Sequence, residues 1–238
     1  AILDSCLECG TLGMVGDGAS PKKYLTGLEA IKKHGGLGIP FFKPREFNLD
    51  IIKRFKAAEE AGALAVGVDI DAASFKTMSM KGQAVGPKTI QELQELRSHL
   101  KVPFILKGIM NVESALSAIE AGADAIVVSN HGGRVMDHMP GTAEVLPEIA
   151  NAVAGRIKVM ADGGIREGVD ILKMLALGAD AVMIGRPLCI AAFGAGQEGV
   201  SFYLQQKMKE LKKAMILTGC GSIDQIDPSI IFRNKGER

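Results

Sequence analysis

The 238-residue sequence has little of several features that mark membrane, secreted or nucleic-acid-binding proteins. It contains no Trp and only two Tyr, and no apolar run approaches the roughly 18 residues of a membrane span. No signal-peptide pattern opens the chain. Neither charge dominates, because 28 Lys and Arg stand against 27 Asp and Glu, a formal net charge of +1. We therefore expect no nucleic-acid partner, no membrane partner and a cytoplasmic location.

Cysteine is also scarce, with four residues, and Cys6 and Cys9 form the one C-x-x-C motif. No second Cys or His pair lies near it to complete a zinc site. We interpret these cysteines as unpaired thiols in a helix, with a metal or redox site as the alternative, and predict no metal ion at the functional site. Glycine is abundant by contrast, at 29 residues, about 12% against an average near 7%. This composition favours a glycine-rich α/β enzyme.

Seven short apolar runs alternate with amphipathic segments and predict parallel strands that are buried on both faces. These runs are residues 11–15, 38–42, 65–70, 104–106, 125–129, 158–160 and 181–184. Helical spacing of apolar residues predicts helices over 50–61, 112–121 and 168–177. Each of these helices is expected to end at a glycine, namely Gly62, Gly122 and Gly178.

A weak internal repeat supports this alternation. The same helix end, turn and strand start recurs from Ala61, Ala121 and Leu177, roughly every 60 residues, or about two βα units. Repeated βα units without a G-x-G-x-x-G fingerprint favour a barrel over a doubly wound sheet. We predict an α/β fold, a (β/α)8 TIM barrel with seven of its eight strands in this chain. Residues 1–238 are interpreted as a single domain.

Polar residues follow five of the predicted strands at the point where each strand ends. They are Asp69, Lys107, the run Ser129-Asn130-His131, Asp162 and Arg186. Because the carboxyl ends of barrel strands form the active face, we expect these side chains to line one pocket.

The chemistry of these residues suggests roles. A buried lysine is rare unless it is paired, so Lys107 either forms a salt bridge with Asp69 or, preferably, stabilises negative charge on a cofactor or substrate. His131 can exchange a proton near neutral pH, and the Arg134 guanidinium suits a carboxylate. The Asp137 carboxylate could pair with either His131 or Arg134.

Two late loops have the composition of a phosphate cradle. The first is Asp162-Gly163-Gly164-Ile165-Arg166, and the second is Ile184-Gly185-Arg186-Pro187. Barrels frequently bind phosphate with the loops after their last two strands, through backbone N–H groups and a helix N-terminus.

Four segments together resemble the FMN-dependent α-hydroxy-acid oxidases and dehydrogenases, the family of glycolate oxidase, lactate oxidase and flavin L-lactate dehydrogenase. They are Lys107-Gly108-Ile109, the run Ser129-Asn130-His131-Gly132-Gly133-Arg134 with Asp137, and the two glycine–arginine loops. The resemblance covers nearly the whole chain. It implies FMN as cofactor, a small L-2-hydroxy acid such as lactate or glycolate as substrate, and oxidation to the 2-oxo acid. Because relatives are often tetramers, it also implies a homo-oligomer.

The same resemblance implies residue roles. His131 would be the base that removes a proton from the hydroxy acid while flavin N5 accepts the electrons. Asp69 would pair with His131 and stabilise its cationic form, and Lys107 would face the pyrimidine edge of the flavin. Arg134 would bind the substrate carboxylate. The remaining cofactor-binding residues would be Ser129, Asp162, Gly163, Gly164, Arg166, Gly185 and Arg186.

Three departures from the family pattern bear on the function. The family's first strand, with its A-P-x-A-like flavin contact, has no counterpart, so the barrel is expected to be incomplete at its N-terminal side. The strand that usually carries a substrate-binding tyrosine reads Gly38-Ile39-Pro40-Phe41-Phe42-Lys43. Lys76 replaces the arginine usually found seven residues after the aspartate. A lysine neutralises a carboxylate but cannot grip it with a planar fork.

These departures leave two alternatives to a hydroxy-acid oxidase. One is an FMN barrel of another reaction class, resembling type 2 isopentenyl-diphosphate isomerase. The other is a flavin-binding barrel without catalytic activity.

Overall fold

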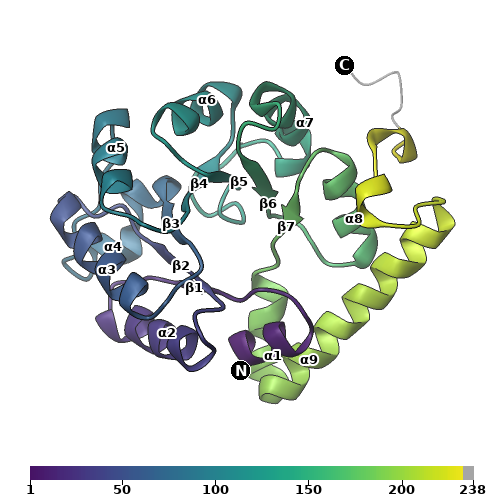
Figure 1. Cartoon of the computed structure of the whole chain (residues 1–238), viewed down its shortest axis with the longest axis horizontal. Coiled ribbons are helices and arrows are strands. Elements are labelled where there is room, and N and C mark those ends of the chain that lie inside the picture. The colour runs from purple at the N-terminus through teal and green to yellow at the C-terminus, as the bar shows by residue number, and fades with distance from the viewer. Residues whose placement is uncertain (233–238) are drawn as a thin grey trace.

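The computed structural model describes residues 1–232 and contains a parallel sheet of seven strands. The strands are β1 (Met14–Gly16), β2 (Ile39–Phe42), β3 (Val66–Asp69), β4 (Phe104–Ile109), β5 (Ala125–Val128), β6 (Lys158–Ala161) and β7 (Ala181–Val182). Each strand pairs with the next strand along the chain. The sheet curls on itself with helices around its outer face (Figure 1). The predicted α/β barrel class and all seven strands are confirmed.

The helices fill the connections between these strands. They are α1 (Ile2–Glu8), α2 (Pro21–Lys33), α3 (Asn48–Glu60), α4 (Lys76–Ser79), α5 (Ile90–Ser98), α6 (Val112–Glu120), α7 (Thr142–Val153), α8 (Gly168–Ala176) and α9 (Arg186–Leu217), with short 3-10 helices at Ile70–Ser74, Ile223–Gln225 and Pro228–Ile230. Non-helical backbone at Ala195 and Gly196 divides α9 into two parts. Among residues 1–232, no helix combines the length and hydropathy needed to cross a membrane.

Local chemistry sets the ends of these helices. The Asn111 side chain accepts a hydrogen bond from the Ser114 backbone N–H at 2.7 Å, which caps the first turn of α6. The predicted stops are confirmed, since α3, α6 and α8 each end two residues before a glycine. At Gly62 the backbone has φ of 77°, a conformation that costs glycine little because it has no Cβ.

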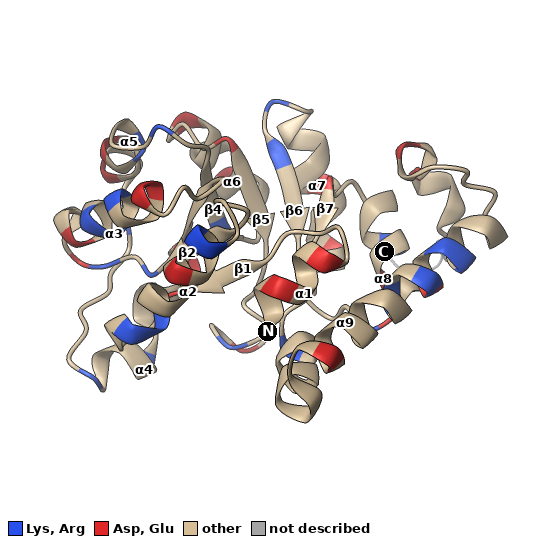
Figure 2. Ribbon diagram, turned by 60° about the horizontal axis from the view of Figure 1, so that its bottom comes forward, with Lys and Arg blue, Asp and Glu red and all other residues tan. Residues whose placement is uncertain are grey.

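The sheet is open between its two outer strands. Within residues 1–232, no ladder joins β7 to β1, which agrees with seven strands of an eight-stranded barrel. Helices α1 and α9 lie together on this side (Figure 1), with buried Cys6, Leu188, Val200 and Leu204 between them. Acidic residues of α1 and charged residues of both signs along α9 are visible in Figure 2.

Alternation along the strands separates two apolar clusters. In β4, Phe104 and Leu106 pack in the cluster beneath the helices, whereas Ile105 belongs to a second cluster inside the barrel. Since successive side chains of a strand point to opposite faces, Lys107 follows Ile105 on the inner face. The same period directs Asp69 inward, two residues after Gly67. The barrel interior therefore changes from apolar to charged at its carboxyl end.

The outer cluster depends on a row of aromatic rings. Phe42, Phe55 and Phe104 are fully buried, and the Phe55 ring centroid lies 6.1 Å from each of the other two. We expect Phe55→Ala to lower the free energy of unfolding by about 3–5 kcal/mol, because it leaves a cavity at the centre of this row. Phe47→Ala is the matched control, since Phe47 is 65% exposed. Equal denaturant midpoints for the two variants would contradict this account of the core.

Candidate active site

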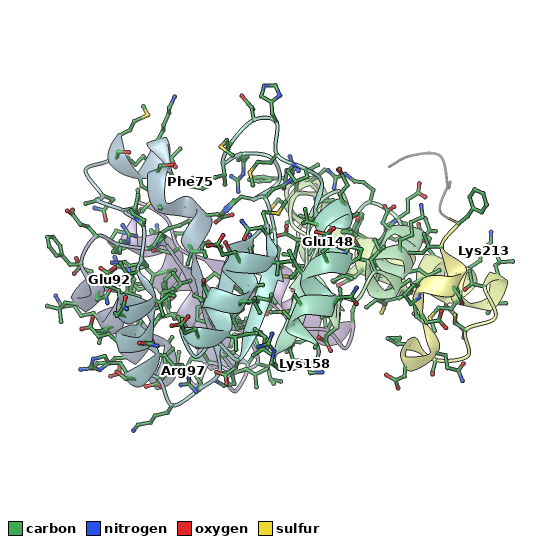
Figure 3. All side chains as sticks on the ribbon, turned by 90° about the horizontal axis from the view of Figure 1, so that it is seen from above. Phe75, Glu92, Arg97, Glu148, Lys158 and Lys213 are labelled. Atoms are coloured by element: carbon green, nitrogen blue, oxygen red, sulfur yellow. The ribbon has the colours of Figure 1, made fainter. Side chains whose placement is uncertain are left out.

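A pocket of about 660 Å³ lies at the carboxyl ends of the strands. In Figure 3 the label Phe75 marks this end of the barrel. Lys158, the first residue of β6, marks the other end. All the predicted site residues except Ser129 line it: Asp69, Lys107, His131, Arg134, Asp162, Gly163, Gly164, Arg166, Gly185 and Arg186. The structure thus brings together residues that are spread over more than a hundred positions of sequence.

Lys107 lies at the centre of a buried polar network. Its ammonium donates a hydrogen bond to Ser129 Oγ at 2.7 Å and lies 3.3 Å from Asp162 Oδ2 and 3.8 Å from Asp69 Oδ1. Asp69 and Lys107 are register partners in the β3–β4 ladder, which explains their proximity. Ser129 is fully buried behind the pocket wall, where its hydroxyl also accepts the His131 backbone N–H at 3.1 Å. Lys107 therefore forms the salt bridge with Asp69 that was the less favoured alternative, and it also faces the pocket.

Asp69 makes its shortest contact with a residue that the sequence analysis did not place in the site. Lys43 Nζ donates to Asp69 Oδ2 at 2.6 Å, and both side chains are at least nine-tenths buried. Burial alone would raise the pKa of Asp69, but Lys43 and Lys107 together outweigh it and hold that pKa below its usual value. Asp69 is therefore ionised near neutral pH. Lys43 directly follows β2, and the strand period was the signal that could have identified it.

The predicted pairing of Asp69 with His131 is not what the structure contains. His131 Nδ1 lies 2.9 and 3.0 Å from the two carboxylate oxygens of Asp71. Asp71 belongs to the 3-10 helix that follows β3, and this turn brings its carboxylate back over the end of the sheet. The resemblance singled out Asp69 for this pairing, whereas the hydrogen bonds of His131 Nδ1 go to Asp71, a residue that no motif singled out.

Phe75 is a second residue that the sequence analysis missed. Its ring centroid lies 4.6 Å from that of His131, 5.1 Å from Lys43 Nζ and 5.8 Å from Arg134 Cζ. Arg134 Nε donates to the His131 carbonyl oxygen at 3.1 Å, so the guanidinium is held beside the histidine. Phe75 is therefore the apolar wall against which three polar side chains of the pocket pack.

Within the part of the chain that the structure describes, two other residues named in the sequence analysis make no ion pair with His131 or Arg134. Asp137 is exposed, and among residues 1–232 no ion pair joins it to His131 or Arg134. Lys76 is exposed and is not among the pocket-lining residues, whereas Lys43 is. Lys43, at the end of β2, is thus one of the cations of the pocket, and Lys76 is not.

The glycine–arginine loops line another part of the pocket, and the Arg186 guanidinium reaches Gly132, the neighbour of His131. Gly185 directly precedes α9, and Arg166 and Arg186 both line the cavity. A side chain at Gly164 or Gly185 would meet no atom within 4 Å, so the backbone of both residues borders open space. Asp162 Oδ1 is buried without a hydrogen-bond partner. A helix N-terminus, two guanidinium groups and bare backbone suit a phosphate.

The C-x-x-C motif lies away from this pocket, in and just after α1. Cys6 and Cys9 are free thiols, as are Cys189 and Cys220. Burial raises the pKa of the Cys6 thiol to about 11, so it is protonated near neutral pH. The interpretation as unpaired cysteines agrees with this geometry.

Fold and site together define a class of protein. A curled parallel sheet carries at its carboxyl edge a histidine on a carboxylate, a buried lysine and a glycine–arginine cradle. This combination is typical of barrel proteins that bind a phosphate-bearing cofactor next to an acid–base group. Residues 71–233 match the FMN-dependent dehydrogenase family. The chain belongs to this family, and the resemblance inferred from its motifs is confirmed.

Individual relatives agree with this assignment. GLO4, a peroxisomal (S)-2-hydroxyacid oxidase of Arabidopsis thaliana, is 35% identical over an alignment that covers 85% of this chain and 64% of the oxidase. An L-lactate dehydrogenase of Caulobacter sp. (strain K31) is 48% identical over 143 residues, covering 60% of this chain and 38% of that protein. The chain therefore spans less than two thirds of the length of these curated relatives.

Solved structures share the fold over nearly the whole chain. The crystal structure of a mandelate oxidase matches with a TM-score of 0.84 at 32% identity, covering 95% of this chain and 71% of that one. A mandelate oxidase with (S)-2-phenylpropionate matches with a TM-score of 0.82 at 34% identity.

Proposed function

We propose that the chain is the barrel of an FMN-dependent enzyme that oxidises a small L-2-hydroxy acid, such as lactate or glycolate, to the 2-oxo acid. The observation that carries this proposal is the position of His131. Its Nδ1 is bound to a carboxylate while the ring lines the same pocket as Lys107, Arg134 and the glycine–arginine loops. The named relatives are oxidases and dehydrogenases, which favours this reaction over the isomerase and non-catalytic alternatives.

The residues present fit FMN. The unpartnered Asp162 Oδ1 is a buried acceptor that a ribityl hydroxyl would satisfy. The phosphate would lie between Arg166 and Arg186, against the open backbone of Gly164 and Gly185. Lys107 would then meet the polar edge of the ring system from the barrel floor. When bound, FMN supplies an acceptor for the two electrons and one hydrogen removed from the alcohol carbon.

The chain's own residues would bind the substrate and move its other proton. Arg134 binds the carboxylate of the hydroxy acid, and Phe75 closes the pocket beside it. With Nδ1 bound to a carboxylate, His131 keeps Nε2 for the substrate hydroxyl and accepts its proton as the 2-oxo group forms. Lys107, fixed by Ser129 and two carboxylates, would face bound FMN with a cation that offsets negative charge there.

The proposal is tested by anaerobic titration of the FMN-loaded protein. Lactate, glycolate and longer L-2-hydroxy acids are added singly, and the yellow absorbance of the flavin is followed. We expect at least one of them to bleach it. Dithionite is the control, because it reduces bound flavin without using the site. Bleaching by dithionite but by none of the acids would reject the proposal.

Arg186→Ala is expected to weaken FMN binding. Loss of a charged hydrogen-bond partner costs about 1.5–3 kcal/mol, which raises the dissociation constant roughly 10- to 100-fold. Fluorescence titration of the apoprotein measures the constant directly. Arg156→Ala is the matched control, since Arg156 is exposed and its guanidinium caps the carbonyl end of α7. If both variants weaken FMN binding equally, Arg186 does not bind the FMN phosphate.

A further inference from the structure

Two carboxylates compete for one histidine in this site. Asp69, Asp71 and His131 each offer a donor or acceptor atom, and these atoms all lie within 4.8 Å of one another. Either carboxylate is therefore close enough to act on the imidazole. The sequence resemblance favours Asp69, whereas the hydrogen bonds select Asp71.

The lysines decide between the two carboxylates. Asp69 is held by Lys43 at 2.6 Å and lies 3.8 Å from Lys107, so two ammonium groups already neutralise it. Among residues 1–232, no Lys or Arg lies within 4 Å of the Asp71 carboxylate, whose ion-pair partner is His131. An opposite charge stabilises an imidazolium most when nothing else neutralises that charge. Asp71 is the better partner on this ground as well as by distance.

We propose that Asp71, and not Asp69, is the positioning residue of His131, and that Lys43 makes this possible by holding Asp69. The proposal rests on the proposed function in one respect, namely that His131 is the base. The Asp71 carboxylate accepts the Nδ1–H, fixes the tautomer and stabilises the ring once Nε2 takes a proton. Asp69 serves a different purpose, as the common partner of Lys43 and Lys107.

The backbone around the pair is shaped for this contact. A Cβ at Gly108 would lie 2.5 Å from Asp71 Cβ and 2.6 Å from Asp71 Cγ, and Gly108 has φ of 108°. The register of the β4–β5 ladder shifts at this residue, which forms a bulge beside the site. His131 itself has φ of 57°, in the left-handed region, and its N–H is bound by Ser129 Oγ. Both side chains of the pair are less than a tenth exposed.

The pairing of His131 with Asp71 is tested by proton NMR of protein whose histidines are isotopically labelled. We expect a downfield Nδ1–H resonance of His131, identified by its loss in His131→Gln. Asp71→Asn should abolish it, and the isosteric control Asp69→Asn should retain it. His34 is an internal reference, because its Nε2 lies 2.8 Å from Asp4 in another part of the chain. A resonance that survives Asp71→Asn, or vanishes only in Asp69→Asn, would overturn the proposal.

Kinetics supply a second reading in the FMN-loaded enzyme. A displaced base slows the reaction on the order of 10²-fold, so Asp71→Asn should slow substrate-driven flavin reduction far more than Asp69→Asn does. Where the wild type is not reduced by any 2-hydroxy acid, the proposed function fails, but the resonance still decides the partner of His131. A crystal structure of the unmodified chain tests the partner of His131 without any substitution. His131 Nδ1 within hydrogen-bond distance of Asp69 instead of Asp71 would reject the proposal.

Discussion

His131→Ala is expected to retain bound FMN and to lose its reduction by 2-hydroxy acids, with a fall of roughly 10³-fold or more in rate. The reason is geometric. Nδ1 is committed to Asp71, so Nε2 is the basic atom that the ring offers to a substrate in the pocket. Stopped-flow absorbance under anaerobic conditions measures the rate, and the flavin spectrum before mixing shows that the cofactor is bound.

His138→Ala is the matched control for this variant. His138 lies on the same loop and is exposed, with no described side-chain hydrogen bond within residues 1–232. In this variant the substrate should reduce the bound flavin at the wild-type rate. If the flavin of His131→Ala is also reduced at that rate, another group takes the substrate proton, and the acid–base assignment is wrong.

Lys107→Met is the variant with the second largest expected effect. It should slow substrate-driven reduction on the order of 10²–10³-fold, because a buried cation that is fixed in advance contributes several kcal/mol to charge stabilisation. It should also lower the reduction potential of bound FMN, since the protein no longer balances the added negative charge. Asp162 loses the one cation that lies within 4 Å of it among residues 1–232. Spectroelectrochemistry and stopped-flow absorbance measure the two effects separately.

Lys158→Met provides the comparison for this substitution. Lys158 begins β6 at the opposite end of the barrel, is 75% exposed in its side chain and pairs with Asp180 (Figure 3). Exposed ion pairs contribute little, so this variant should match the wild type in potential and rate. An unchanged potential in Lys107→Met would mean that Lys107 is a structural cation only.

The fold could be predicted from the sequence largely because parallel strands carry a strong local signal. Each inner strand is a short apolar run between polar turns, and each of three helices ends near a glycine at a similar spacing. The strand ends were less certain. The predicted run 181–184 extends two residues beyond β7, because Met183 and Ile184 are apolar but lie in the turn that leads to Gly185.

The site could be predicted best where a functional residue lies at or shortly after the carboxyl end of a strand. Lys107 lies in the last part of β4, Asp162 directly follows β6, and His131 follows β5 by three residues, and the fold itself brings these strand ends together. Asp71 lies in the 3-10 helix after β3 and Phe75 directly follows it, and this segment packs against Gly108 of β4 and against His131. The choice of partner between Asp69 and Asp71 depends on Lys43, which comes from a different strand.

The central claim is that this pocket couples oxidation of a 2-hydroxy acid to bound FMN. Its most direct test is a single-turnover reaction without oxygen, in which flavin bleaching and 2-oxo acid are quantified in the same sample. The account predicts one 2-oxo acid formed for each flavin reduced, with the L-enantiomer active. Bound flavin that dithionite bleaches but that no 2-hydroxy acid reduces, with no 2-oxo acid formed, would contradict it.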